Sequence, residues 1–242
     1  WITDGRNPLT ARVMVNRLWQ HHFGQALVRT PNNFGFKSDP PTHPKLLDWL
    51  AAEFMEPTVA GGEPWTLKRL HKLIMTSDSY RQQSIHPKET DYTERDFLNR
   101  NWWKFNRHRL NSESLRDAML SVSGRLNLKM GGPSFYPKMS SEALEGLSRK
   151  SSDWKDSTPG EQSRRSIYMM TKRSRLLPLM TAFDFSDTTI TCGQRDVTIV
   201  APQALALLNN HFAHSQSEAL AKRLAGQTGN TAEQIKLAWR LA

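Results

Sequence analysis

The chain of 242 residues is long enough for one large domain or two small ones, and with 38% hydrophobic and 23% charged residues it can bury a core. Its single cysteine, Cys192, excludes an internal disulfide, a cysteine-rich zinc site and a covalently attached haem. It contains no run of about 18 apolar residues, so we expect no membrane span, and its net charge of +10 leaves polyanions open as partners.

The first predicted element is a helix that begins at Asn7-Pro8, where an N-cap residue precedes proline at the first helical position, and ends before Gly24. Apolar residues cover nearly its whole circumference when the chain turns by about 100° per residue. Such a helix is surrounded by its neighbours, so we expect it to be the central, buried helix of the fold.

Polar residues of this helix need partners. Arg12 and Asn16 fall inside its apolar sector, where an unpaired polar group is costly. Asp184 and Asp187, far along the chain, are the expected acidic partners of Arg12 and Arg17. The contact would be either an ion pair that fixes the fold or the wall of a cleft that grips an anionic or polyhydroxyl ligand.

Helical spacing of apolar residues predicts most of the remaining structure. The expected helices follow capping or proline signals at Thr42-His43-Pro44, Thr66, Asn111, Leu176, Pro202, position 212 and Thr231. Residues 82–98 are polar and predict a surface loop, which leaves room for a short turn of helix. The segment 166–171 is the best strand candidate, and residues 188–191 are a second.

The predicted fold is mainly α, an irregular multi-helix domain with at most one small β-sheet or hairpin. We expect one helical domain over residues 1–242. Residues 130–163 are rich in Ser, Lys and Gly, and we expect an irregular or mobile excursion there. The chain starts at Trp1 without a signal peptide and stops at Ala242 inside a helical pattern, which predicts a piece excised from a longer protein.

Strong chemical motifs are absent from the sequence, among them the P-loop, Gly-x-Gly-x-x-Gly, His-Glu-x-x-His and Gly-x-Ser-x-Gly. His21 and His22, with His43, suggest a metal, but adjacent helical residues point about 100° apart and cannot easily share one ion. We therefore expect no metal and favour packing or capping roles for these histidines.

The segment 99–109 combines four Lys or Arg residues with three aromatic residues and no acid. Such mixtures bind nucleic acid by phosphate contacts and base stacking, or stack on sugar rings. The alternative is a core segment in which Trp102, Trp103 and Phe105 lie under the stems of the basic side chains. A second basic cluster is most simply a solvated rim; it comprises Arg164, Arg165, Lys172, Arg173 and Arg175.

Two further candidates are weaker. Cys192 lies close in sequence to Arg195, which would lower the pKa of a nearby thiol, but a small buried apolar side chain is the simpler interpretation. Asp184 and Asp187 are three residues apart and would suit an acid and base pair if their carboxylates approached one another.

Several ordered motifs resemble the planctomycete domain of unknown function 1553 family (DUF1553). They are residues 7–24, 42–51, 67–74, 80–82, 164–168, 183–185 and 201–209. Ser38 stands where glycine is common in the family, and Val197-Thr198-Ile199 replaces a more usual Thr-Thr-Val. These departures concern loop geometry.

The resemblance implies a context more than an activity. Members usually form the C-terminal part of large exported proteins, often with a cytochrome c-like domain and sometimes a lectin-like one. It therefore implies an extracytoplasmic location, no cofactor in this chain, and haem, where present, in other domains of the parent protein. No catalytic residue carries over.

The first functional hypothesis is a non-catalytic binding or scaffold domain whose basic, Trp-bearing surface engages an acidic glycan or a neighbouring haem domain. The second is part of a carbohydrate-active or redox enzyme with a cleft around Arg12, Arg17 and Asp184, and nucleic-acid binding ranks third. The sequence does not decide whether the chain is catalytic. The candidate ligand-binding residues are Arg12, Asn16, Arg17, His21, Trp102, Trp103, Asp184 and Arg195.

Overall fold

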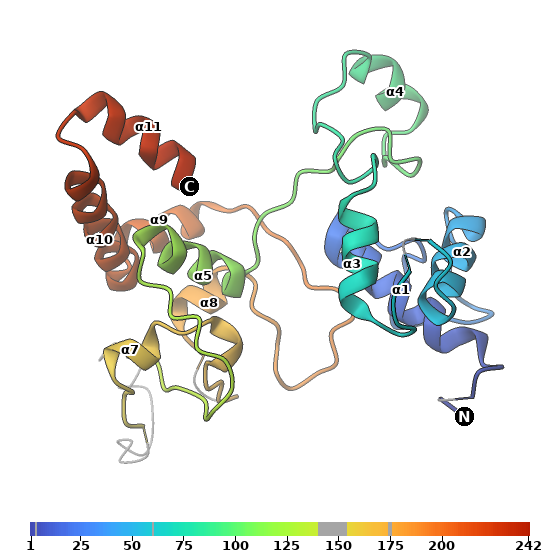
Figure 1. Cartoon of the computed structure of the whole chain (residues 1–242), viewed down its shortest axis with the longest axis horizontal. Helices are drawn as coiled ribbons and strands as arrows, with labels where there is room; N and C mark the ends of the chain where they lie inside the picture. The colour runs from blue at the N-terminus through green and yellow to red at the C-terminus, as the bar shows by residue number, and fades with distance from the viewer. Residues whose placement is uncertain (3, 60, 140–153, 174–175) are drawn as a thin grey trace. The chain divides into compact units, whose positions relative to one another are not determined.

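The computed structural model describes the chain except for residues 3, 60, 140–153 and 174–175 (Figure 1). Within the described residues it contains helices and two isolated parallel bridges, but no strand, so the predicted mainly α fold is confirmed. The described residues group into two compact units, unit 1 (Trp1–His108) and unit 2 (Arg109–Ala242). A single domain over residues 1–242 stays a prediction.

The helices follow the predicted order. Unit 1 contains α1 (Pro8–Phe23), α2 (Pro44–Met55), α3 (Leu67–Met75) and α4 (Glu89–Arg95). Unit 2 contains α5 (Ser112–Ser123), α7 (Pro159–Gln162), the 3-10 helix η1 (Ser166–Tyr168), α8 (Pro178–Ala182), α9 (Ala201–Asn209), α10 (His211–Gln227) and α11 (Thr231–Leu241). Helix α4 lies within 82–98, where the sequence predicted a surface loop with room for a short turn of helix.

The predicted bounds of α1 are confirmed. The Asn7 side chain accepts a hydrogen bond from the Leu9 amide at 3.0 Å, and Gly24, in the left-handed region at φ 78°, donates to the Gln20 carbonyl at 2.8 Å. Helix α1 packs against both α2 and α3. Its buried face carries the core of unit 1, while Met14 remains 39% exposed, so the helix is central without being enclosed on every side.

Asn16 explains how a polar residue fits into this core. Its side chain is almost fully buried, accepts from the Val28 amide at 2.8 Å and donates to the Val28 carbonyl at 3.0 Å. These two bonds satisfy a backbone segment that belongs to no helix or strand. The predicted need for a partner at Asn16 is confirmed.

A shielded ion pair joins α2 to α3. Arg69 donates to the Glu53 carboxylate at 2.5 Å and to the Glu53, Val59 and Gly61 carbonyls. The carboxylate also accepts from the Thr58 hydroxyl and from the Thr58 and Val59 amides. These hydrogen bonds, that of the Thr58 hydroxyl foremost, lower the pKa of Glu53 to about 2.

Unit 2 is organised around α5, which contacts α8, α10 and η1. The predicted start of α5 is confirmed, because the Asn111 side chain accepts from the Ser114 amide at 2.8 Å. The helix ends at Gly124, which adopts a left-handed conformation, whereas the sequence pattern predicted its end at Met130-Gly131-Gly132-Pro133.

Two buried arginines hold the irregular segments beside α5. Arg116 donates to the carbonyls of Arg164 and Gln162, and Arg164 donates to those of Pro133 and Gly131. The Arg164 side chain is fully buried, so its assignment to a solvated rim is wrong. Arg165 and Arg173 of that cluster are exposed, and Arg175 lies outside the described residues.

Both strand predictions are wrong. Ser166 begins the 3-10 helix η1 instead, because its amide and hydroxyl both bond the Asp117 carboxylate of α5, at 2.8 and 2.7 Å. Met169 forms an isolated bridge with Phe135, and no strand is present among the described residues of this segment. Asp187 turns the chain by accepting from the Thr189 amide and hydroxyl, which prevents an extended strand at 188–191.

The predicted excursion at 130–163 is only partly described, since residues 140–153 lie outside the described residues. The described parts are irregular apart from α7, and they are anchored. Phe135 and Trp154 are buried, and the Trp154 indole donates to the Pro137 carbonyl at 3.0 Å.

We predict that Asn16→Ala strongly destabilises unit 1. Hydrogen bonds contribute about 0.5–1.5 kcal/mol each and an orphaned buried group costs about 1–3 kcal/mol, so the free energy of unfolding should fall by about 2–4 kcal/mol. Denaturant unfolding of the full chain, followed by tryptophan fluorescence, measures it. Arg17→Ala, at an exposed neighbouring position, should change it by less than about 0.5 kcal/mol. Equal effects would contradict the role of Asn16.

We also predict that acid weakens unit 1 through Glu53. Its pKa in the folded chain lies below that of an unfolded glutamate, so its stabilising contribution is present above about pH 4.5 and is lost as the pH falls towards 2. Unfolding curves at pH 7, 4 and 3 measure this slope. Glu53→Gln should flatten the slope, whereas Glu56→Gln, which neutralises an exposed carboxylate, should not. A Glu53→Gln chain with the wild-type slope would overturn the assignment.

Candidate functional site

A hollow of about 400 Å³ lies on unit 1 between α4 and the segment that follows it. This volume is within the range of about 300–1,000 Å³ that small-ligand sites occupy. We call it the 84–107 hollow, after the residues that line it: Ser84, Ile85, Glu89, Lys104, Phe105, Asn106 and Arg107. Its wall combines two cations and one carboxylate with a hydroxyl, an amide and two apolar side chains.

The charges of the 84–107 hollow leave one cation in excess. Lys104 donates to the Glu89 carboxylate at 2.6 Å. That bond, the Lys104 charge and the nearby Arg107 lower the pKa of Glu89, which therefore stays ionised. Arg107 donates through Nε to the Ser84 hydroxyl at 3.0 Å. Among the described residues, its terminal amino groups have no hydrogen-bond partner, so they remain available to an acceptor.

The backbone behind the hollow is strained and firmly held. Asn99 and Trp102 adopt left-handed conformations, at φ 47° and 56°, which are uncommon for residues with side chains. The Asn99 side chain accepts from the Trp103 amide at 2.9 Å and donates to the Lys104 carbonyl at 2.7 Å and the Asn106 side chain at 2.9 Å. One buried asparagine thus sets the backbone of the residues that line the hollow.

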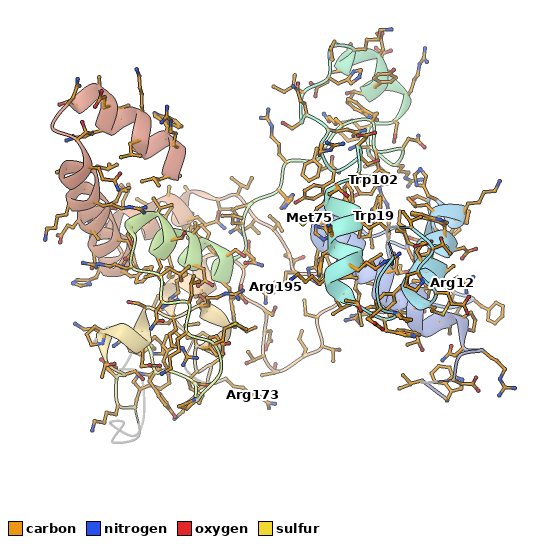
Figure 2. The ribbon with its side chains drawn as sticks, in the orientation of Figure 1. Arg12, Trp19, Met75, Trp102, Arg173 and Arg195 are labelled. Carbon is orange, nitrogen blue, oxygen red and sulfur yellow. The ribbon has the colours of Figure 1, made fainter. Side chains whose placement is uncertain are left out.

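The two tryptophans of this segment serve packing. Trp102 is buried with its ring 5.6 Å from that of Trp19 on α1 (Figure 2). Trp103 packs against Tyr92, donates its indole N–H to the Asp96 carbonyl at 3.2 Å, and carries the Lys104 ammonium over its ring at 4.6 Å. The neighbouring Lys104 and Arg107, rather than the tryptophans, reach the hollow.

The predicted site residues of α1 do not gather at this hollow's wall. Arg12 pairs with Asp48 of α2 at 2.7 Å, so the expectation that its partner is Asp184 or Asp187 is wrong. Asn16 is buried in the core, and Arg17 and His21 are exposed on the helix. A cleft that includes Asp184 of unit 2 stays a prediction.

Asp184 and Arg195 both fix the irregular segment 185–200 within unit 2. Asp184, left-handed at φ 57°, pairs with Arg109 at 2.5 Å and accepts from the Thr198 amide at 2.8 Å. These contacts, the Thr198 amide first, lower its pKa. Arg195 makes a two-point ion pair with Glu113 of α5, at 2.6 and 2.8 Å. The carboxylates of Asp184 and Asp187 each accept hydrogen bonds from a threonine, Thr198 and Thr189 respectively, and their pairing as acid and base stays a prediction.

Two further sequence predictions were that Cys192 is buried and that the chain holds no metal ion. Cys192 is exposed, so the prediction of a buried apolar side chain is wrong; it sits in the irregular segment and its thiol donates to the Gln194 carbonyl at 3.1 Å. Among the described residues, no group of three or more His, Cys, Asp or Glu side chains is arranged to hold a metal ion.

These features define a mainly helical protein with a cation-bearing surface hollow. No helix in the described part of the chain combines the length and the apolar character needed to cross a membrane. The chain belongs to the family PSD1, protein of unknown function (DUF1553), whose model matches residues 1–242, so the predicted resemblance is confirmed. No curated protein and no solved structure matches the chain.

We predict that Asp184→Asn loosens the segment 185–200. Charge-assisted hydrogen bonds contribute about 1.5–3 kcal/mol, so exchange of the Thr198 amide should accelerate by about tenfold or more. Hydrogen exchange followed by NMR or mass spectrometry measures this rate. Asp196→Asn neutralises an exposed carboxylate of the same segment and should leave the rate unchanged. Acceleration by both variants would refute a specific role for Asp184.

Proposed function

We propose that the chain is a non-catalytic binding module whose 84–107 hollow takes an acidic glycan. The observation that carries the proposal is Arg107, whose terminal amino groups have no hydrogen-bond partner among the described residues, beside Lys104 in a hollow large enough for a small ligand. A planar guanidinium matches a carboxylate or sulfate in a two-point contact.

The remaining lining suits a sugar. Glu89 is an ionised acceptor for hydroxyl groups, and Ser84 and Asn106 offer both donors and acceptors. Phe105 supplies an apolar surface for the C–H face of a ring. Because Glu89 already neutralises Lys104, the hollow favours a ligand with one anionic group among several hydroxyls, such as a uronic acid or a singly sulfated sugar, over a dense polyanion.

The setting of this module follows from the family resemblance. We propose that it works outside the cytoplasm as one domain of a larger exported protein, with any haem carried by other domains. A neighbouring haem domain is the competing partner for the same cations, since its propionates are also carboxylates. Nucleic acid fits less well, because the hollow offers a carboxylate beside its cations, and the Trp103 ring already packs against Tyr92 and lies under the Lys104 ammonium.

We predict that Arg107→Gln weakens binding of an acidic oligosaccharide by at least about tenfold, since a two-point charged contact is worth roughly 1.5–3 kcal/mol. Calorimetry of the full chain with an oligogalacturonate and a sulfated oligosaccharide measures this. Arg100→Gln is the matched control: it removes the same charge from an exposed residue of the same segment that does not line the hollow.

Salt and a neutral sugar complete the test. Raising ionic strength from about 0.02 M to 0.3 M shortens the Debye length and should weaken binding, and a neutral glucan should not bind. The proposal fails if neither acidic sugar binds at low ionic strength, or if Arg100→Gln and Arg107→Gln weaken binding equally.

A further inference from the structure

A pair of histidines lies elsewhere in unit 1, in neither the hollow nor its wall. His22 is in the last turn of α1 and His71 is in the middle of α3. The structure brings His22 Nε2 and His71 Nδ1 to within 2.7 Å of each other. The sequence offered His21 and His43 as companions for His22, and helical geometry sets the side chain of the adjacent His21 apart from it.

The packing of unit 1 fixes both rings. Helices α1 and α3 are in contact, and the two imidazole rings lie 5.0 Å apart at 69°. Tyr80 stands edge-on to His22 with ring centres 5.4 Å apart, and the next residue, Phe23, is buried in the core. Both histidines are only half-buried, so a small ion can reach them from solvent.

We propose that His22 and His71 form a two-ligand site for a divalent transition metal of the kind that prefers imidazole nitrogen, Cu²⁺ or Zn²⁺. The inference does not depend on the proposed glycan site. Metal–nitrogen bonds of about 2.0–2.1 Å place two coordinating nitrogens roughly 3.0–3.4 Å apart. The 2.7 Å separation therefore needs to open by only a few tenths of an ångström.

The proton balance of this step is simple. In the metal-free pair, one facing nitrogen carries the hydrogen that the other accepts. When the metal binds, that hydrogen moves to the outer nitrogen of the same ring, and both facing lone pairs coordinate the ion.

Two protein ligands leave the remaining coordination positions open. No group of three or more potential ligands exists in the described residues, so water or a small anion would complete the shell. The site should accordingly be an open one, and Cu²⁺ should bind more tightly than Zn²⁺, as expected for imidazole ligands.

The test is metal titration of the tag-free full chain in a non-coordinating buffer at pH 7. Calorimetry with Zn²⁺ and electron paramagnetic resonance with Cu²⁺ report stoichiometry and the number of nitrogen ligands. His22→Gln and His71→Asn are the informative variants, because each amide places a hydrogen-bonding atom near the nitrogen it replaces without offering a good metal ligand. Circular dichroism and thermal unfolding confirm that each variant is folded.

We expect one ion per chain, two nitrogens in the Cu²⁺ spectrum, and a rise in the melting temperature with metal that both variants abolish. Loss of a residue that only hydrogen-bonds to a metal ligand weakens metal binding by about 10–100-fold. Each variant removes a ligand itself, so each should weaken metal binding by at least about tenfold. The double variant His211→Gln with His214→Gln removes two histidines of α10 and should bind as the wild type does. Binding that survives in His71→Asn, or that is lost in the α10 variant, would overturn the proposal, as would a wild-type chain that binds neither ion.

Discussion

The aromatic cluster around Phe23 is the interaction on which most of unit 1 depends. Phe23 is almost completely buried, stacks on Trp19 with ring centres 4.1 Å apart, and meets Trp102, Tyr80 and Phe105 within 6 Å. Each such pair contributes about 0.5–1.5 kcal/mol beyond burial. Phe23 is the last residue of α1, and its contacts with Tyr80, Trp102 and Phe105 hold the chain from 80 to 105 against the end of the helix. Phe105 reaches the hollow and His22 precedes Phe23, so both proposed sites are built on the same rings.

Local signals in the sequence predicted the helices well, because each depends on atoms a few residues apart. Asn7, Gly24 and Asn111 cap α1 and α5 as expected. The partner of Arg12 depends instead on which distant carboxylate approaches it. Periodicity showed that Arg12 lies in the apolar sector, but it could not distinguish Asp48, which is 36 residues away, from Asp184.

The segment 99–109, to which composition pointed, supplies four of the residues that line the hollow, but its tryptophans are not among them. Composition drew attention to residues 99–109, and it favoured the tryptophans because aromatic residues are common in sugar and nucleic-acid sites. The left-handed backbone at Asn99 and Trp102 decides that Trp102 packs inwards, and helix α4 brings Glu89 to Lys104. Neither feature leaves a periodic pattern, so neither could be read from the sequence. His71 escaped notice for the same reason, since only the contact between α1 and α3 makes it a neighbour of His22.

The buried arginines of unit 2 bind mostly to backbone carbonyls, those of Gly131, Pro133, Gln162 and Arg164. A carbonyl acceptor is present whatever side chain its residue carries. Evolution can therefore change the side chains at most of these acceptor positions without breaking the contacts, whereas replacement of either guanidinium removes several hydrogen bonds at once. We therefore expect relatives of this chain to differ in the loops of unit 2 and to keep Arg116 and Arg164.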